Sequence, residues 1–413
     1  MRTTARWYIK FLQWKTQYLT HRQFILLLCG LVGVATGFAA LAMRSLTHFI
    51  EEVLVGNIIR YINYGFYVIF PAVGFLLVYW VKKYIIRKEV SHGIPSILYA
   101  VAKQKGIMKR FQAYGSILTA PITIGFGGSV GLEGPMVVTG AGISSQVARL
   151  FHINQSDRML LLACACAAAL AAIFKVPLAG ILFAIEVFGL DLTLSSLLPL
   201  FVASLSGVLT SYIFFGNAAL LPIYVGDSFL MHNIPFYLLL GVVGGFMSAY
   251  FTFVYEGVNR FFSKFSSAYL RIVIGGAILG LLVFVMPPLY GEGHEVINHL
   301  KAGHPELSIS SNIFGWNLEN PWVVILLLGG LVLFKVVATS VTFGAGGVGG
   351  IFSPMLFMGG VMGNCFARII NQIDILPYKL PLANFTLIGM TALMTGVLHA
   401  PLTAIFLIAE GTG

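Results

Sequence analysis

A carboxylate in an apolar, glycine-rich stretch is the first candidate for chemistry in this chain. Glu133 lies in the sequence Gly131-Leu-Glu-Gly-Pro135, and apolar residues follow it. Carboxylates in apolar protein segments are costly and usually functional, as proton carriers or as partners of an ion. The alternative interpretation is local, with Glu133 next to a helix N-cap and its charge satisfied by nearby amide groups.

Three glycine–proline stretches could supply an anion site, and none contains lysine or arginine. Each predicts a helix that begins at its proline, because the missing N–H of proline would be unpaired there anyway. The first turn of a helix has free N–H donors and partial positive charge, which favour anions. Close helix packing is the rival reason for glycine, and no Gly-Lys-Ser/Thr of a phosphate loop follows. The stretches are Ser91–Pro95, Phe126–Pro135 and Phe343–Pro354.

The elements that position these stretches are predicted to be membrane helices. Of 413 residues, 58% are hydrophobic and 10% are charged, and the mean hydropathy is +0.89. Soluble domains have about a quarter of their residues charged. Shorter apolar segments suggest broken helices, which membranes tolerate only where protein covers the backbone. Segments long enough to span a bilayer are Phe24–Leu41, Tyr64–Val81, Ser156–Phe174, Leu190–Phe215, Pro235–Tyr255, Ile272–Leu289 and Trp322–Thr342.

The formal charge of +10 is placed unevenly and predicts the topology. Residues 1–23 are basic and contain no acid, and a second basic region runs from Lys82 to Arg110. By the positive-inside rule both regions are cytoplasmic, which is favoured over nucleic-acid binding. No cleavable signal peptide is expected. The predicted location is a plasma (inner) membrane.

Internal matches predict a duplicated unit. Phe174-Lys-Val-Pro-Leu-Ala-Gly-Ile-Leu-Phe-Ala-Ile-Glu186 resembles Leu398-His-Ala-Pro-Leu-Thr-Ala-Ile-Phe-Leu-Ile-Ala-Glu410, and a shorter match lies upstream of each. Internal symmetry of this kind is typical of transporters whose substrate site lies between the halves near the membrane midplane. We therefore expect a first half at residues 24–230 and a second at 231–413.

Enzyme chemistry has weak support. The run Gly291-Glu-Gly-His-Glu-Val-Ile-Asn-His299 resembles a metalloprotease motif, but its two histidines are five residues apart instead of four. An intramembrane metal-dependent hydrolase is therefore only a remote alternative. We expect no enzyme activity, no metal and no cofactor. The four cysteines, in apolar segments, are expected to be buried and unpaired: Cys29, Cys164, Cys166 and Cys365.

The motifs resemble those of the CLC family of chloride channels and chloride/proton antiporters over nearly the whole chain. Gly131-Leu-Glu-Gly-Pro135 is similar to the family's Gly-Arg/Lys-Glu-Gly-Pro, Gly350-Ile-Phe-Ser-Pro354 to Gly-x-Phe-x-Pro, and Ser91-His-Gly-Ile-Pro95 to Gly-Ser-Gly-Ile-Pro. The resemblance implies an all-α polytopic membrane protein with an inverted-topology repeat. Its broken helices would meet at a midplane anion site.

The same resemblance implies roles for particular residues. Glu133 would gate the pathway by competing with chloride and yielding when protonated. The protein would be a homodimer, with an interface formed by Pro177–Tyr212 and Pro401–Glu410. Chloride, protons and lipid are the implied partners, without nucleic acid. The implied anion-binding residues are His92, Gly93, Ile94, Gly134, Ile351 and Phe352.

Four departures from the family pattern affect the function. Leu132 replaces a basic residue, and His92 replaces a serine that helps to coordinate the anion, so the preference among chloride, fluoride and nitrate stays open. Val187 stands where exchangers commonly have a proton-accepting glutamate, with Glu186 one residue before. The chain ends at Gly413, before two helices and a tyrosine of the family, so the second half looks truncated. We expect a voltage- or pH-gated chloride channel, with a proton-coupled antiporter for chloride or another halide as the alternative.

Overall fold

The computed structural model describes residues 17–59, 65–88, 90, 93–216, 230–301, 318–374 and 376–412. Over these ranges the regular structure is helical apart from one isolated bridge, so the predicted all-α fold is confirmed. The α-helices are α2 (His21–Glu51), α3 (Phe66–Trp80), α4 (Gly93–Gln104), α5 (Gly115–Gly125), α6 (Glu133–Leu150), α7 (Gln155–Phe174), α8 (Pro177–Phe188), α9 (Leu194–Phe215), α10 (Ile234–Ser263), α11 (Ala268–Val285), α12 (His294–Lys301), α14 (Pro321–Gly344), α15 (Phe352–Ile373), α16 (Leu382–Leu398) and α17 (Pro401–Thr412).

Seven helical segments of the described chain are long and apolar enough to cross a membrane, and each contains most of one predicted span. The first extends beyond α2 to Gly56 because a π-helical segment, Glu52–Ile59, continues it. The span predicted to end at Leu289 stops earlier, because α11 ends at Val285 and two prolines follow it. The chain is therefore a multi-pass membrane protein.

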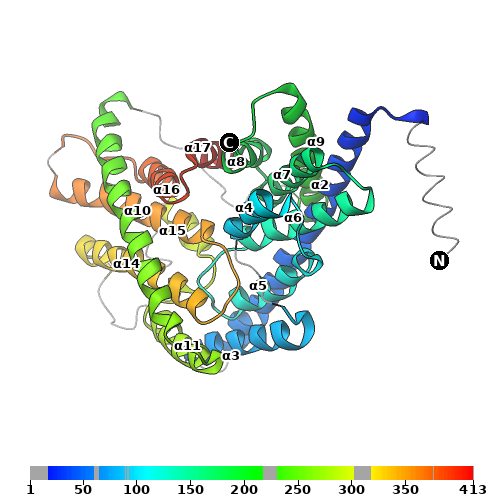
Figure 1. The fold of residues 1–413 in the computed structure, drawn as a ribbon. Coiled ribbons are helices and arrows are strands. Elements are labelled where there is room, and N and C mark those ends of the chain that lie inside the picture. The colour runs from blue at the N-terminus through cyan, green and yellow to red at the C-terminus, as the bar shows by residue number, and fades with distance from the viewer. Residues whose placement is uncertain are drawn as a thin grey trace.

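The start of α6 and most of α7 lie in the interior. Figure 1 shows α4, α6 and α15 near the centre, with most of α2 to α9 on one side and most of α10 to α17 on the other. Every residue from Leu161 to Phe174 of α7 is buried, and so are residues 127–142 around the start of α6. Non-helical backbone at membrane depth is stable only when protein covers it, and this packing provides the cover.

The division into halves at 24–230 and 231–413 stays a prediction, but several contacts join segments far apart in the chain. Helix α8 packs against α17, α3 packs against α11, and α6 touches α15. The four cysteines are buried and unpaired, as expected; the thiols of Cys29 and Cys164 are 3.7 Å apart.

Glycines lie at the tightly packed crossing of α15 and α16. A Cβ added at Gly363 would collide with the carbonyl oxygen of Phe385, and one added at Gly389 would collide with the carbonyl oxygen of Gly359. Backbone cannot move aside as the end of a flexible side chain can. Small residues at this crossing therefore set how closely the two helices approach.

We expect Gly363→Ala to destabilise the folded protein by about 1–3 kcal/mol, because the added methyl group forces α15 away from α16. The matched control is Gly329→Ala in α14, where an added Cβ meets nothing within 4 Å. That change should leave stability equal or raise it by up to about 1 kcal/mol. Thermal unfolding of the detergent-purified proteins measures both, and equal midpoints would contradict the packing argument.

Candidate functional site

Two similar turns lead into the centre of the molecule. After α5, the amides of Gly127 and Gly128 donate to carbonyl groups of the last helical turn, and after α14 Gly346 and Gly347 do the same. The backbone φ angles of Gly127 and Gly346 are 95° and 93°, values that L side chains rarely adopt. Glycine at these two positions therefore lets each chain leave its helix and cross the interior.

The two glycine-rich loops bind each other through backbone groups. The amide of Gly131 donates to the carbonyl of Gly350 at 2.9 Å, and the amide of Gly350 donates to the carbonyl of Gly131 at 2.7 Å. A Cβ at Gly134 would lie 2.9 Å from the Cα of Gly350. These contacts hold the N-terminus of α6 directly against that of α15.

Two threonine hydroxyl groups also join the two loops. The amide of Val348 donates to Thr123 Oγ1 at 3.0 Å, and the amide of Ser129 donates to Thr342 Oγ1 at 3.1 Å. Thr123 precedes the first loop and Thr342 the second, so each loop receives a partner from the other. Buried amides in a membrane need such partners, because no lipid group can replace them.

Three helices begin at this centre, and in each the proline is the third helical residue. The prediction that helices begin at the proline is wrong by two residues, since α4, α6 and α15 begin before Pro95, Pro135 and Pro354. The third N–H of a helix also lacks an intrahelical acceptor, so proline loses nothing there. The amides before each proline remain available at the helix N-terminus.

One cavity of 520 Å³ brings together most of the predicted site residues from α4, α6, α8 and α15. His92 lies outside the described residues, so its predicted contact with an anion stays a prediction. The lining includes Gly93, Ile94, Gly134, Glu186, Val187, Ile351 and Phe352.

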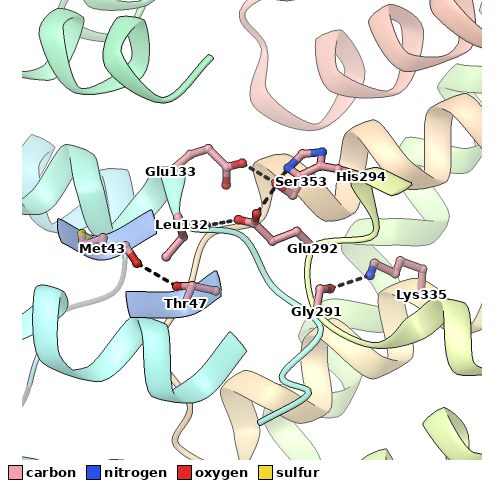
Figure 2. Close-up of polar contacts among 9 residues, drawn as sticks. All are labelled: Met43, Thr47, Leu132, Glu133, Gly291, Glu292, His294, Lys335 and Ser353. Atoms are coloured by element: carbon pink, nitrogen blue, oxygen red, sulfur yellow. Dashed lines mark hydrogen bonds and ion pairs between the residues drawn. The ribbon is translucent and has the colours of Figure 1, made fainter. Parts of the chain in front are cut away.

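Glu133 is fully buried, and Figure 2 shows its carboxylate pointing toward Ser353. Ser353 Oγ donates a hydrogen bond to Glu133 Oε1. The carboxylate also faces the backbone amides of Glu133 and Ser353, the first turns of both helices. Its second oxygen, Oε2, has no hydrogen-bond partner among the described residues. The carboxylate thus occupies the place where the two helix N-termini favour an anion.

A second cavity, of 610 Å³, approaches Glu133 from the other side. Glu292 and His294 reach from its wall toward Glu133 (Figure 2). Glu292 Oε1 accepts from the amide of Leu132 at 2.8 Å, and His294 Nε2 lies 3.2 Å from Ser353 Oγ. Its titratable lining residues are His48, Glu51, Glu52, Tyr67, Tyr290, Glu292, His294, Glu295 and His299. Neighbours of Glu133 thus line both cavities: Gly134 lines the first, and Glu292 and His294, which contact Leu132 and Ser353, line the second.

A buried lysine supports the loop that carries this pair. Lys335 Nζ, on α14, donates to the carbonyl of Gly291 at 3.0 Å and lies 4.6 Å from the ring centre of Phe357. The sequence analysis missed Lys335, Glu292 and Ser353 as parts of the site. A lysine inside a predicted span was a usable signal, because intramembrane charges usually have a partner and a purpose.

Glu133, Glu292 and His294 are one group of the described side chains whose ligand atoms all lie within 4.8 Å of one another. One oxygen of each carboxylate already accepts a hydrogen bond, from Ser353 and from Leu132. This arrangement suits groups that share protons better than a metal centre. His299, needed for the metalloprotease interpretation, is not in the group, so that alternative gains no support.

The carboxylate of Glu186 caps the start of α17, far along the chain. This carboxylate accepts from the free amides of Leu402 and Thr403, at 2.8 and 2.7 Å, at the start of α17. Glu410 accepts in turn from two free amides at the start of α8, at 3.1 and 2.9 Å. The side chain beside Val187 is thus engaged in a reciprocal structural contact.

Comparison with known proteins agrees with this architecture. The sequence profile of the voltage-gated chloride channel family matches residues 73–413. A ClcB-like chloride channel protein of Ralstonia nicotianae is 27% identical over 403 residues, which cover 94% of this chain and 89% of the relative. The H(+)/Cl(-) exchange transporter ClcA of Salmonella arizonae is 27% identical over 402 residues, which cover 94% of this chain and 81% of the exchanger.

Solved structures share the fold. A slow cyanobacterial Cl−/H+ antiporter matches with a TM-score of 0.77 and 22% identity, over 95% of this chain and 90% of that one. A CLC-type fluoride/proton antiporter matches with a TM-score of 0.77 and 21% identity, over 95% of this chain and 92% of that one.

Removal of the Glu186 carboxylate and removal of the Glu410 carboxylate should lower the stability of the protein by similar amounts. We expect Glu186→Ala and Glu410→Ala each to destabilise the protein by about 0.5–2 kcal/mol, because each change leaves two amides of a first helical turn without their acceptor. Thermal unfolding in detergent measures the loss, and Glu256→Ala, at an exposed site on α10, is the control. A large effect at Glu186 with none at Glu410 would contradict the reciprocal capping.

Proposed function

Because the chain belongs to the voltage-gated chloride channel (CLC) family, we propose that this member exchanges chloride for protons. Anion transport is the coarser function that family membership establishes. The observation that carries the finer proposal is the buried Glu133 carboxylate, held between two cavities at the N-termini of α6 and α15. An anion and a protonatable group are thereby made to compete for one place.

Chloride would bind through backbone amides in the 520 Å³ cavity, whose lining includes the first residues of α4, α6 and α15. A partial charge at a helix N-terminus contributes about 0.3–1 kcal/mol for each helix, far less than a full positive charge in the same place. Gly93, Gly134 and Phe352 lie in these first turns. A site of this strength can bind an anion and still release it, as conduction requires.

Glu133 would be the gate and the proton carrier. While ionised, its carboxylate fills the anion position and accepts from Ser353. Protonation removes the charge that the helix N-termini favour, so chloride displaces the side chain. When chloride leaves toward one side and the proton toward the other, each turnover couples the two movements.

Exchange is favoured here over the channel function that Val187 suggested. Exchange transporters and antiporters are among the similar proteins, beside one named as a channel. Val187 lines the 520 Å³ cavity, and the carboxylate of its neighbour Glu186 is held by α17. A proton released from Glu133 would therefore cross this cavity through water instead of through an acid at position 187.

We also propose an orientation in the membrane and a dimer interface for the transporter. The positive-inside rule places the basic N-terminus in the cytoplasm and the 610 Å³ cavity on the outer face of a plasma (inner) membrane. Two copies would associate through Pro177–Tyr212 and Pro401–Glu410, as the family resemblance implies. The exposed side chains of α9 that could pack across this interface are Leu194, Leu198, Phe201, Leu205, Leu209 and Ile213.

Proteoliposomes loaded with chloride should take up protons as chloride leaves, even against a proton gradient. Exchange predicts this because the chloride gradient supplies the energy that moves protons in the opposite direction. A chloride electrode and an external pH electrode record both fluxes from the same sample. Chloride efflux with no proton movement would overturn exchange and restore the channel interpretation.

Glu133→Gln should lower the proton flux by about 100-fold or more, while chloride still crosses. The amide keeps the size of the side chain but cannot carry a proton. Glu256→Gln, an exposed carboxylate on α10, is the matched control and should exchange normally. Coupled proton flux that persists in Glu133→Gln would show that another group carries the proton.

A further inference from the structure

We propose that Glu292 and His294 form a second proton-binding site, which passes protons between the 610 Å³ cavity and Glu133 through the hydroxyl of Ser353. The proposal rests on the exchange function above and names the route by which protons reach its gate. Sequence motifs do not single out this route, since its members come from α6, the loop before α12, α12 itself and α15.

The first support is a continuous chain of polar contacts. Glu292 Oε2 lies 3.5 Å from His294 Nε2, His294 Nε2 lies 3.2 Å from Ser353 Oγ, and Ser353 Oγ donates to Glu133 Oε1. The chain leads from solvent to the interior. The exposed fractions of the His294 and Glu292 side chains are 13% and 20%, whereas Glu133 is fully buried. Protons reach buried groups along such chains when each member can both donate and accept.

The second support is that the pair is held in place. The amide of Leu132 fixes Glu292 Oε1, so that Oε2 is the oxygen directed at the imidazole. Lys335 Nζ binds the carbonyl of Gly291, the residue just before Glu292. A proton-transfer group works only when its geometry is maintained, and these two contacts maintain it.

The third support is the charge of the surroundings. Burial raises the pKa of Glu292 well above its ordinary value, and the nearby Glu133 carboxylate raises this pKa further. A carboxyl group with a raised pKa keeps its proton to higher pH than an ordinary glutamate, so it can serve as a proton reservoir. The charged groups that surround the pair are Arg44 and Glu51 on α2, Glu133 on α6, Glu295 on α12 and Lys335 on α14.

Carboxylates outnumber lysine and arginine on the wall of the cavity itself. A concave wall of one charge sign concentrates ions of the opposite sign. The cavity would therefore attract protons and disfavour chloride at the same mouth, which suits a proton inlet.

Each transfer conserves protons. The imidazolium of His294 gives its Nε2 proton to Ser353 Oγ while the hydroxyl proton of Ser353 passes to Glu133 Oε1. The products are a neutral His294 with its proton on Nδ1, an unchanged serine hydroxyl and a protonated Glu133. Glu292 then returns a proton to His294 Nε2, and solvent in the cavity recharges Glu292. The reverse sequence releases protons to the same cavity.

The test compares coupled fluxes in proteoliposomes for His294→Gln, Glu292→Gln and Ser353→Ala against the unmodified protein. Each variant should lower proton flux by about tenfold while chloride flux persists, because water replaces the relay only in part. The retained chloride flux shows that the variant protein is folded. His299→Gln, five residues further along the chain on the wall of the same cavity, is the control and should keep the normal proton-to-chloride ratio.

The outcomes separate the two proposals. Unmodified protein that moves chloride without protons would overturn exchange, and the relay with it. Unmodified protein that exchanges normally, together with all three variants at the normal proton-to-chloride ratio, would overturn the relay alone. A lowered ratio in His299→Gln equal to that in His294→Gln would also overturn it, because the effect would then belong to the cavity charge in general. A lowered ratio in the three variants only is the expected result.

Discussion

The structure depends on how two glycine-rich loops satisfy each other's backbone in the membrane interior. An unpaired amide costs several kcal/mol in lipid, so a chain that breaks its helices there needs an acceptor for every exposed donor. Here the loops provide the acceptors reciprocally, through Gly131 with Gly350 and through the hydroxyl groups of Thr123 and Thr342. Since these bonds fix the ends of two helices against each other, the remaining free amides of both helices converge on one place.

That convergence explains why a carboxylate can be buried at Glu133. The first turns of α6 and α15 face it, and Ser353 donates to it, so the helix ends stabilise an anion that lipid alone would not. A site that stabilises a carboxylate also stabilises a small inorganic anion. In the proposed exchange, competition between the two would follow from this geometry, and protonation of the carboxylate would decide which of them is bound.

The two sides of Glu133 differ in chemistry. On one side the cavity is lined largely by glycine, apolar residues and helix N-termini, a surface that accepts chloride without holding it. On the other side lie carboxylates and histidines, and Glu292 accepts from the amide of Leu132. Glu186, beside the first cavity, is engaged as a helix cap. The acidic groups able to exchange protons therefore lie mainly on one side of the gate.

The sequence by itself determined the membrane class, the seven spans and the glycine–proline breaks before α6 and α15, and it singled out Glu133 as a candidate. These features are local, because hydropathy, segment length and the backbone freedom of glycine act within a few residues along the chain. Only the tertiary structure decided that Glu292, His294 and Ser353 adjoin Glu133 and that Lys335 supports their loop. Leu132 and Glu292 are 160 residues apart, and Glu133 and Ser353 are 220 residues apart. Contacts over such distances follow from how the helices pack, which no periodicity in a single sequence records.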